Sequence, residues 1–132
     1  MKIVTLRQIL ILHELEIKNR GGSSGIRDAG MLKSAVGRPF ATFAGEDLYP
    51  DVYSKAAALV QSIVKNYPFV DGNKRTAFAS AVIFLKLNGY LLEVSQRAVV
   101  GFMLRVTNIN LSVDEISSWI RKHSKKLEAR SW

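Results

Sequence analysis

The sequence predicts an all-α fold, a compact bundle of about six helices in a single domain over residues 1–132. Apolar residues recur every three or four positions along most of the chain, which is the spacing of a helix with one buried face. No segment alternates apolar and polar residues as a half-exposed strand does. Short hydrophilic joints containing Gly, Pro, Asn or Asp separate the periodic segments. Helices packed around one core are the architecture that this pattern favours.

A first helix is expected from about 6 to 18. Thr5 and Gln8 have the spacing of a capping box, in which each side chain bonds the other residue's backbone N–H. The apolar face of this helix includes His13, which is expected to be a hydrogen-bonded core residue and not a base or a metal ligand. The residues on that face are Leu6, Ile9, Leu10, His13 and Ile17.

Residues 20–25, Arg-Gly-Gly-Ser-Ser-Gly, predict a flexible connection to a short second helix. Asp28 is a residue type that caps helices, and the second helix is expected to run to about Val36. Pro39 cannot continue it. Over residues 38–50 the composition shifts to turn residues and aromatics, which predicts an ordered surface loop.

The third and fourth helices are expected on either side of a polar turn. Asp51 opens the third helix, and its apolar residues keep helical spacing up to Asn66. Residues 76–87 are apolar on nearly every face, so this helix is expected to be the buried centre of the bundle. Asn88-Gly89 is expected to end it in a left-handed cap.

A fifth helix is expected from about 96 to 107, with Phe102 and Met103 in the core. Ser112 and Glu115 form a second capping box, which starts a sixth helix. Trp132 is expected to be frayed. The inner stripe of the sixth helix is expected to contain Ile116, Trp119, Ile120, His123 and Leu127.

The amino-acid composition limits the classes of protein to which this chain can belong. The chain has a net charge of +8, is 48% hydrophobic and contains no cysteine, which excludes a disulfide framework and thiol chemistry. With two histidines and no cysteine, a zinc site is not expected. The longest apolar run, Ala77–Leu85, is too short to cross a bilayer, and polar residues from Arg7 onward interrupt the N-terminal apolar residues too early for a signal peptide. A soluble cytoplasmic protein without membrane contact is therefore expected. Basic residues near the C-terminus are expected on a solvated helix face: Arg121, Lys122, Lys125, Lys126 and Arg130.

The turn between the third and fourth helices carries the strongest chemical signal. Pro68 disfavours the helical conformation for the residue before it, and Asp71-Gly72-Asn73 supplies turn chemistry. The first N–H groups of a helix lack internal partners and form an anion site, to which Lys74 and Arg75 add positive charge. Asp71 is an oxygen ligand of the kind that Mg²⁺ takes beside nucleotide phosphates. The competing interpretation is an ordinary tight turn that caps a helix, with both cations solvated.

Over nearly its whole length the chain resembles the Fic/Doc family. In the family motif a histidine, a proline, a phenylalanine and an acidic residue precede Gly or Ala and then Asn-Lys-Arg-Thr-Ala, at the spacings of residues 67–77 here. Lys74 is typical of the Doc (death-on-curing) branch, because the adenylylating Fic branch has glycine there. Flanking segments agree as well: Gly25-Ile26-Arg27-Asp28, Leu32, Ser34-Ala35, Arg38-Pro39, Gly45-Glu46-Asp47-Leu48-Tyr49-Pro50, Phe84-Leu85 and Asn88-Gly89-Tyr90.

This resemblance implies the toxin of a type II toxin–antitoxin system. Such a toxin transfers phosphate from ATP to a hydroxyl of the translation elongation factor that carries aminoacyl-tRNA, and so inhibits translation. By the same resemblance Asp71 would hold Mg²⁺, Gly72 would let the backbone approach the phosphates, and Asn73, Lys74 and Arg75 would bind them. A cognate antitoxin would dock over the site. Residues 38–50 would be the flap that aligns the target, although the aromatics there would also serve to cover the core.

One position departs from the motif, because Tyr67 stands where the family has its catalytic histidine. Unperturbed tyrosine has a pKa of ~10 against ~6.5 for histidine, so about one phenol in a thousand is ionised at neutral pH. Weak or absent catalysis is therefore expected. Three alternatives remain: a non-catalytic module that binds nucleotide or antitoxin, an adenylylating enzyme, and a small basic protein that binds RNA or DNA. Direct nucleic-acid binding is not expected, because no recognition module accompanies the charge.

Overall fold

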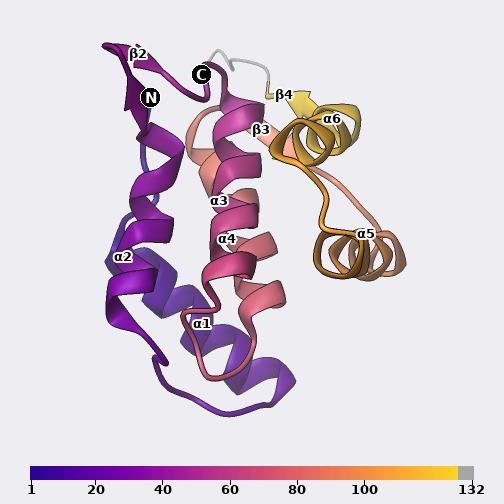
Figure 1. Cartoon of the computed structure of the whole chain (residues 1–132). Helices are drawn as coiled ribbons and strands as arrows, with labels where there is room; N and C mark the ends of the chain where they lie inside the picture. Colours follow the sequence, from indigo (N-terminus) through magenta and orange to yellow (C-terminus); the bar gives the residue numbers. More distant parts are fainter. Residues whose placement is uncertain (128–132) are drawn as a thin grey trace, which may run out of the picture.

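The computed structural model describes residues 1–127, and the expectations for Arg130 and Trp132 lie outside this range. Within it the chain forms an all-α bundle (Figure 1), which confirms the predicted fold class. None of the helices in residues 1–127 has both the length and the hydropathy needed to cross a bilayer. The helices are α1 (Leu6–Arg20), α2 (Ala29–Gly37), α3 (Val52–Asn66), α4 (Asn73–Leu87), α5 (Gln96–Asn108) and α6 (Val113–His123), with a 3₁₀ turn, η1 (Arg38–Phe40).

The helix starts follow the predicted chemistry. Thr5 and Gln8 form a complete capping box at α1, and Ser112 forms one with Glu115 at α6. The carboxylate of Asp28 accepts from the backbone N–H of Met31, three residues into the turn that opens α2. Side-chain acceptors therefore satisfy N–H groups that would otherwise lack partners at these three helix starts.

Two small antiparallel sheets depart from the expectation that the chain has no strands. The first pairs β1 (Thr42–Phe43) with β2 (Glu46–Asp47), and the second pairs β3 (Tyr90–Leu92) with β4 (Ser124–Lys126). Strands of two or three residues are too short to show an alternating pattern, which is why the sequence did not reveal them.

The second sheet also corrects the predicted end of the sixth helix. Helix α6 stops at His123, so Leu127 lies beyond β4 and not on the helical stripe. Lys125 and Lys126 lie on β4, so the basic residues do not form one helix face. Part of their charge is paired, because Lys125 Nζ lies 3.0 Å from Glu93 Oε1.

Helix α3 is central to the bundle and packs against α2, α4, α5, α6 and η1. Helix α4, predicted as the buried centre of the bundle, packs against α1, α3, α5 and β3 with one face, and its other face lines a groove. A helix with apolar residues on nearly every face can be buried on all sides, or it can turn one apolar face to a groove that binds a partner. The sequence pattern is the same in both cases. The buried residues of α4 are Asn73, Thr76, Ala77, Ser80, Ala81, Phe84 and Leu85.

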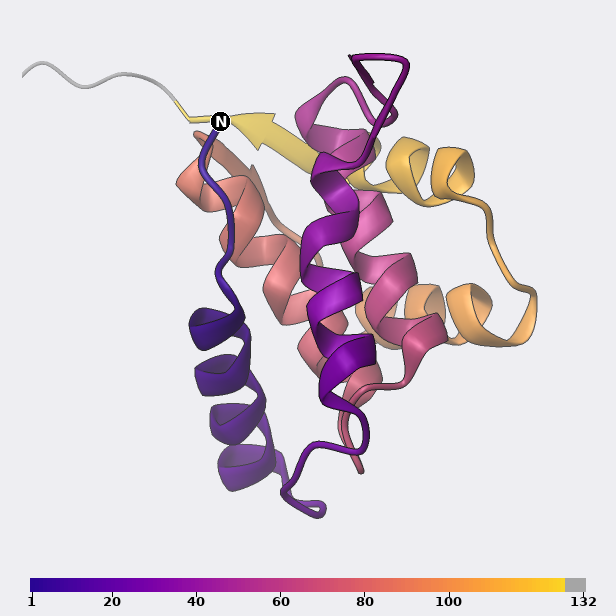
Figure 2. The same cartoon turned by 60° about the vertical axis from the view of Figure 1, so that its left-hand side comes forward.

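The C-terminal end of α4 lies beside the N-terminal residues and beside β4 (Figure 2), and hydrogen bonds join it to both. The Asn88 side chain accepts from the backbone N–H of Lys2 at 2.8 Å and donates to its carbonyl at 2.9 Å. The N–H of Leu127 donates to the carbonyl of Gly89 at 2.8 Å. Gly89 has φ +85°, which confirms the left-handed cap predicted there.

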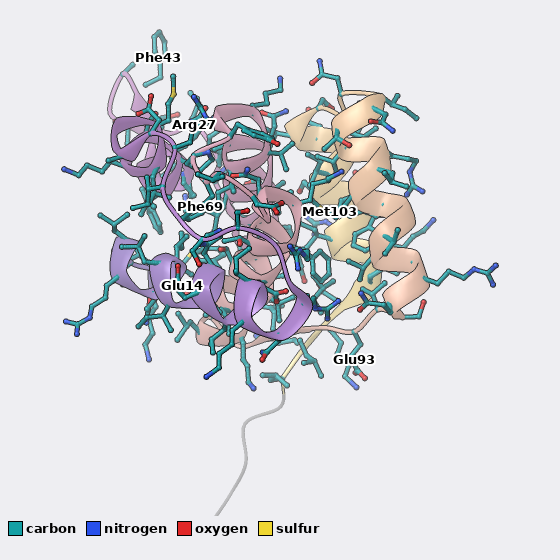
Figure 3. All side chains as sticks on the ribbon, turned by 90° about the horizontal axis from the view of Figure 1, so that it is seen from below. Glu14, Arg27, Phe43, Phe69, Glu93 and Met103 are labelled. Carbon is teal, nitrogen blue, oxygen red and sulfur yellow. The ribbon has the colours of Figure 1, made fainter. Side chains whose placement is uncertain are left out.

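The loop over 38–50 does not lie beside the polar turn, so its assignment as a flap is wrong. The β1–β2 hairpin is anchored near the start of α3, where the buried ammonium of Lys55 lies 3.0 Å from Asp47 Oδ2. The polar turn follows the other end of α3, whose 15 residues rise about 22 Å. Figure 1 shows the hairpin and the turn at opposite ends of the bundle. Phe40 packs edge-on against Phe84 in the core, whereas Phe43 is 76% exposed and points away from the body of the protein (Figure 3).

Candidate functional site

All six residues predicted for the site line one pocket of about 320 Å³. They lie on the turn between α3 and α4, which we call the motif loop (residues 67–72), and on the first turn of α4. The C-terminal end of α5 closes the pocket with Thr107 and Asn108, which the sequence reasoning missed because nothing local distinguishes them from other polar helix ends. The six predicted residues are Tyr67, Asp71, Gly72, Asn73, Lys74 and Arg75.

The motif loop is held closed by the side chain of Asn73. Its Oδ1 accepts from the backbone N–H of Phe69 at 3.0 Å, and its Nδ2 donates to the carbonyl of Phe69 at 2.9 Å. Asn73 is 5% exposed. Because both ends of its amide are used inside the loop, this side chain fixes the shape of the motif loop and has little left to offer a ligand directly.

His13 is a buried core residue of α1 that is hydrogen-bonded to the motif loop. Its Nε2 lies 2.8 Å from the carbonyl oxygen of Asp71, and a carbonyl can only accept, so Nε2 carries the hydrogen. The imidazole is 2% exposed. The prediction of a core role for His13 is confirmed, and its partner is the site itself.

Residues 21–25, which we call the glycine segment, lie along the motif loop and are hydrogen-bonded to it, which the prediction of a flexible connection did not include. An antiparallel bridge joins Ile26 to Phe69, beside a bond from the N–H of Val70 to the carbonyl of Gly25 at 3.0 Å. The N–H of Arg27 donates to the carbonyl of Pro68 at 2.7 Å. Backbone pairing of this kind leaves no side-chain pattern in the sequence, and the glycines gave the opposite impression.

The carboxylate of Asp71 lies at the surface of the pocket and accepts from two backbone N–H groups. Ser23 donates to Oδ2 at 3.1 Å, and Gly72 donates to Oδ1 at 2.8 Å. These bonds, with the positive charge of Arg75, hold the pKa of the Asp71 carboxyl below its usual value. Each oxygen keeps a free lone pair, so an ionised carboxylate remains available to a cation.

This donor set fits Mg²⁺ bound together with a nucleotide and does not suit a cage made by the protein alone. Within residues 1–127 no three His, Cys, Asp or Glu side chains converge on one point. Mg²⁺ keeps several waters and takes one or two carboxylates plus substrate phosphates, so a single Asp71 is enough for it.

The start of α4 faces the pocket without a side-chain cap. Gly72 is the N-cap residue and has φ +74°. This backbone conformation favours glycine, and a Cβ on Gly72 would also come 3.1 Å from Cδ1 of Ile17, which would have to shift by a few tenths of an ångström. The uncapped N–H groups lie at the positive end of the helix dipole beside the exposed ammonium of Lys74, and groups of this kind attract anions.

Arg75 is tethered to the end of α1. Its Nη2 donates to the carbonyl of Gly21 at 2.9 Å, and its Nη1 donates to the carbonyl of Glu16 at 3.4 Å. A guanidinium has five N–H groups, so donors remain for a phosphate.

Tyr67 ends α3 in a left-handed conformation, with φ +50° and ψ +53°, which is uncommon for a residue with a side chain. Arg27 holds the backbone there, because its Nε donates to the carbonyl of Tyr67 at 2.6 Å and its Nη2 donates to that of Asn66 at 2.8 Å. The Tyr67 side chain is 53% exposed and lines the pocket beside Lys74 and Arg75. The phenol is thus presented to the same pocket as these two cations.

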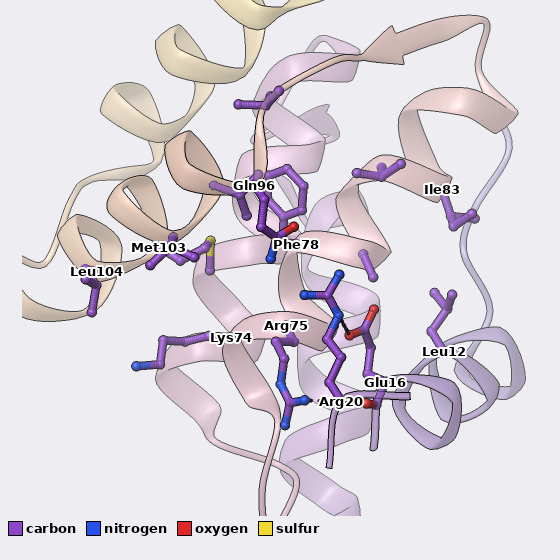
Figure 4. A pocket seen from close by; sticks show the side chains of 15 residues that line it. Leu12, Glu16, Arg20, Lys74, Arg75, Phe78, Ile83, Gln96, Met103 and Leu104 are labelled. Carbon is purple, nitrogen blue, oxygen red and sulfur yellow. Dashed lines mark hydrogen bonds and ion pairs between the residues drawn. The ribbon is translucent and has the colours of Figure 1, made fainter. Parts of the chain in front are cut away.

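A groove of about 470 Å³ opens next to this pocket and shares Lys74 and Arg75 with it (Figure 4). Its wall comes from the outer face of α4, the facing side of α5 and one side of α1. At one end Arg20 pairs with Glu16 at 3.3 Å. The apolar lining consists of Leu12, Phe78, Ala79, Val82, Ile83, Val94, Val99, Val100, Met103 and Leu104.

Comparison with known proteins places this site in a family. The model of the Fic/DOC family matches residues 3–85, which include the motif loop and the glycine segment. The chain is 54% identical over 72 residues to "Toxin Doc" of Mycolicibacterium smegmatis, a match that covers 54% of this chain and only 55% of that relative. It is 33% identical over 89 residues to "Protein kinase doc" of Escherichia phage P1, a match that covers 67% of this chain and 70% of that relative. The chain belongs to the Fic/DOC family, in its Doc branch.

Proposed function

We propose that this protein is the toxin of a type II toxin–antitoxin pair, acts in the cytoplasm and transfers phosphate from ATP to a hydroxyl of the elongation factor that carries aminoacyl-tRNA. The observation that carries the proposal is the joint placement, in one pocket, of an uncapped helix N-terminus, the ammonium of Lys74 and the ionised carboxylate of Asp71. Phosphoryl transfer depends mainly on positioning and on stabilising charge, and these groups supply both. The relative in phage P1 is named a protein kinase, which supports the choice of phosphate over nucleotide transfer.

The residues of the pocket take separate roles in this proposal. The first N–H groups of α4 and the side chains of Lys74 and Arg75 bind the phosphates, and Asp71 holds Mg²⁺. Bound at Asp71, Mg²⁺ would supply positive charge that offsets the negative charge of the phosphates. Gly72 lets the backbone approach the phosphates, while Asn73 fixes the loop that presents them.

Tyr67 limits the rate of this reaction. No second carboxylate and no imidazole lines the pocket in residues 1–127, where Asp71 is the only side chain of either kind. Nothing in the pocket therefore replaces the general base that Tyr67 lacks. A missing general base typically costs roughly 10²–10⁴ in rate. This observation favours a second candidate function, a module that binds Mg²⁺-nucleotide or antitoxin without turnover.

The partner that we propose is a cognate antitoxin whose C-terminal segment lies in the groove between α1, α4 and α5. The groove is apolar along its length and carries Lys74, Arg75 and the ion pair of Arg20 with Glu16 at the end that adjoins the nucleotide pocket, so this end has an excess of positive charge. An amphipathic segment with acidic residues at that end complements it. Since Lys74 and Arg75 line both cavities, such a segment would block the site.

The decisive experiment incubates the protein and the elongation factor with ATP labelled at the γ-phosphate, and in parallel with ATP labelled at the α-phosphate. Transfer of the γ-label supports the proposal, and transfer of the α-label indicates an adenylylating enzyme. If neither label moves while Mg²⁺-ATP still binds by calorimetry, the binding module is correct. Asp71→Ala and Arg75→Ala should each weaken that binding, and unchanged affinity in both variants would overturn the nucleotide site.

A further inference from the structure

The backbone of Gly22 lies so close to the Asp71 carboxylate and the Arg75 guanidinium that a Cβ at this position would clash with them. A Cβ built on Gly22 would meet Asp71 Oδ2 at 2.6 Å, Asp71 Cγ at 3.1 Å and Arg75 Nη2 at 3.2 Å. Its φ is +114°, a conformation that favours glycine. The backbone of the glycine segment is therefore packed directly against a carboxylate and a guanidinium.

The two neighbours of Gly22 each bind one of these groups. The N–H of Ser23 donates to Asp71 Oδ2 at 3.1 Å, and the carbonyl of Gly21 accepts from Arg75 Nη2 at 2.9 Å. Three consecutive residues thus offer a donor to the anion and an acceptor to the cation, and glycine at the centre allows both bonds at once.

This arrangement solves a problem that the motif spacing creates. Asp71, in the motif loop, and Arg75, in the first turn of α4, carry opposite charges that attract each other. A direct pair would consume the metal ligand and the phosphate donor together. No ion pair joins them within residues 1–127, since the nearest partners of both side chains are backbone atoms.

We propose that Gly22 is a positioning residue of the site: through Ser23 and Gly21 it keeps the Asp71 carboxylate and the Arg75 guanidinium apart, so that one is free for a divalent cation and the other for phosphate. The inference rests on the proposed nucleotide site and deepens it. Backbone partners of a metal-binding carboxylate fix its orientation, and their loss typically costs about 10- to 100-fold in metal affinity.

The first test needs no ligand and compares thermal unfolding of Gly22→Ala with that of Gly45→Ala. Gly45 also has a positive φ, +82°, and nothing within 4 Å of its Cβ position, so this control carries a positive-φ strain without a clash. Gly22→Ala should lower Tm more than the control does. The excess should shrink when Asp71→Ala is already present, because the two Asp71 atoms that the new Cβ meets are then gone and only Arg75 Nη2 at 3.2 Å remains. No excess, or an excess of the same size in the Asp71→Ala background, overturns the proposal.

The second test measures the affinity for ADP by calorimetry, once with Mg²⁺ and once with EDTA. Gly22→Ala should weaken binding about 10- to 100-fold with Mg²⁺ and much less with EDTA, while Gly45→Ala matches the parent protein in both. A merely structural role would lower both affinities alike and would overturn the proposal. If the parent protein binds ADP and Gly22→Ala binds equally well with Mg²⁺, only the role of Gly22 is wrong. If the parent protein does not bind ADP at all, the proposed nucleotide site fails, and this inference fails with it.

Discussion

The imidazole of His13 lies flat against the ring of Phe69, with centroids 3.8 Å apart and planes inclined by 6°. The same imidazole reaches the carbonyl of Asp71 through Nε2 at 2.8 Å. His13 of α1 therefore contacts the motif loop twice, through ring stacking at Phe69 and through a hydrogen bond at Asp71.

Replacing His13 tests how much this support contributes. His13→Leu replaces the imidazole with an apolar side chain of similar size and leaves the Asp71 carbonyl without its donor, so the free energy of unfolding should fall by about 1–3 kcal/mol. His13→Gln, whose amide keeps a donor, should lose less. Denaturant unfolding of the two variants measures the difference, and equal stability of His13→Leu and the parent protein would contradict the assignment.

Asn73 and Lys74 are adjacent but should respond in opposite ways to truncation. Asn73→Ala leaves the N–H and carbonyl of the buried Phe69 without partners, so it should lower the free energy of unfolding by about 2–3 kcal/mol. Lys74→Ala removes an exposed charge and should leave Tm unchanged while weakening nucleotide binding. Thermal melts and calorimetry on both variants check this, and equal melts for the two would refute the structural role of Asn73.

Tyr67→His should raise the rate of phosphate transfer to the elongation factor by about 10²–10⁴, because imidazole is mostly unprotonated near pH 7 and phenol is mostly protonated. Nucleotide affinity should change little. Tyr67→Phe is the matched control, since it keeps the ring and removes the hydroxyl, and it should not gain activity. The measurement is the initial rate at equal nucleotide saturation, and a histidine variant no faster than the parent would show that more than the base is missing.

The carboxyl of Asp71 should make stability depend on pH at the acid end. Its pKa is lowered in the folded state by the N–H groups of Ser23 and Gly72, so its contribution is present above the unfolded value of ~3.9 and is lost as the pH falls through the lower folded value. The Tm difference between the parent protein and Asp71→Asn should therefore be constant from about pH 5 to 8 and shrink below about pH 4. A difference that grows on acidification would have the wrong sign.

The sequence predicted the helices and the candidate site because both are local. Capping boxes and helical spacing lie within a few residues of one another, and so do Tyr67, Asp71, Lys74 and Arg75 in the motif. The prediction that these side chains share one pocket required only that a loop precede a helix.

What the sequence could not predict depends on contacts between distant segments. The glycine segment is composed like a flexible linker, yet backbone bonds order it against the motif loop. The 38–50 loop is composed like a functional loop, yet the bond from Lys55 to Asp47 anchors it at the other end of α3. Composition describes a segment's own preferences, and in both cases tertiary contacts decided its place.

Asp71 is hydrogen-bonded to residues from the first quarter of the chain, and this affects the order in which the protein folds. The bonds to Ser23 and His13 span 48 and 58 residues, whereas α3, the motif loop and α4 form one local hairpin. Contacts between distant residues require closure of a long loop, so the helical hairpin can form early and the finished pocket only when α1 docks. Opening of α1 alone would then dismantle the pocket while α3 and α4 stay paired, which hydrogen exchange would register as earlier loss of protection at the amide of Ser23 than in the centre of α3.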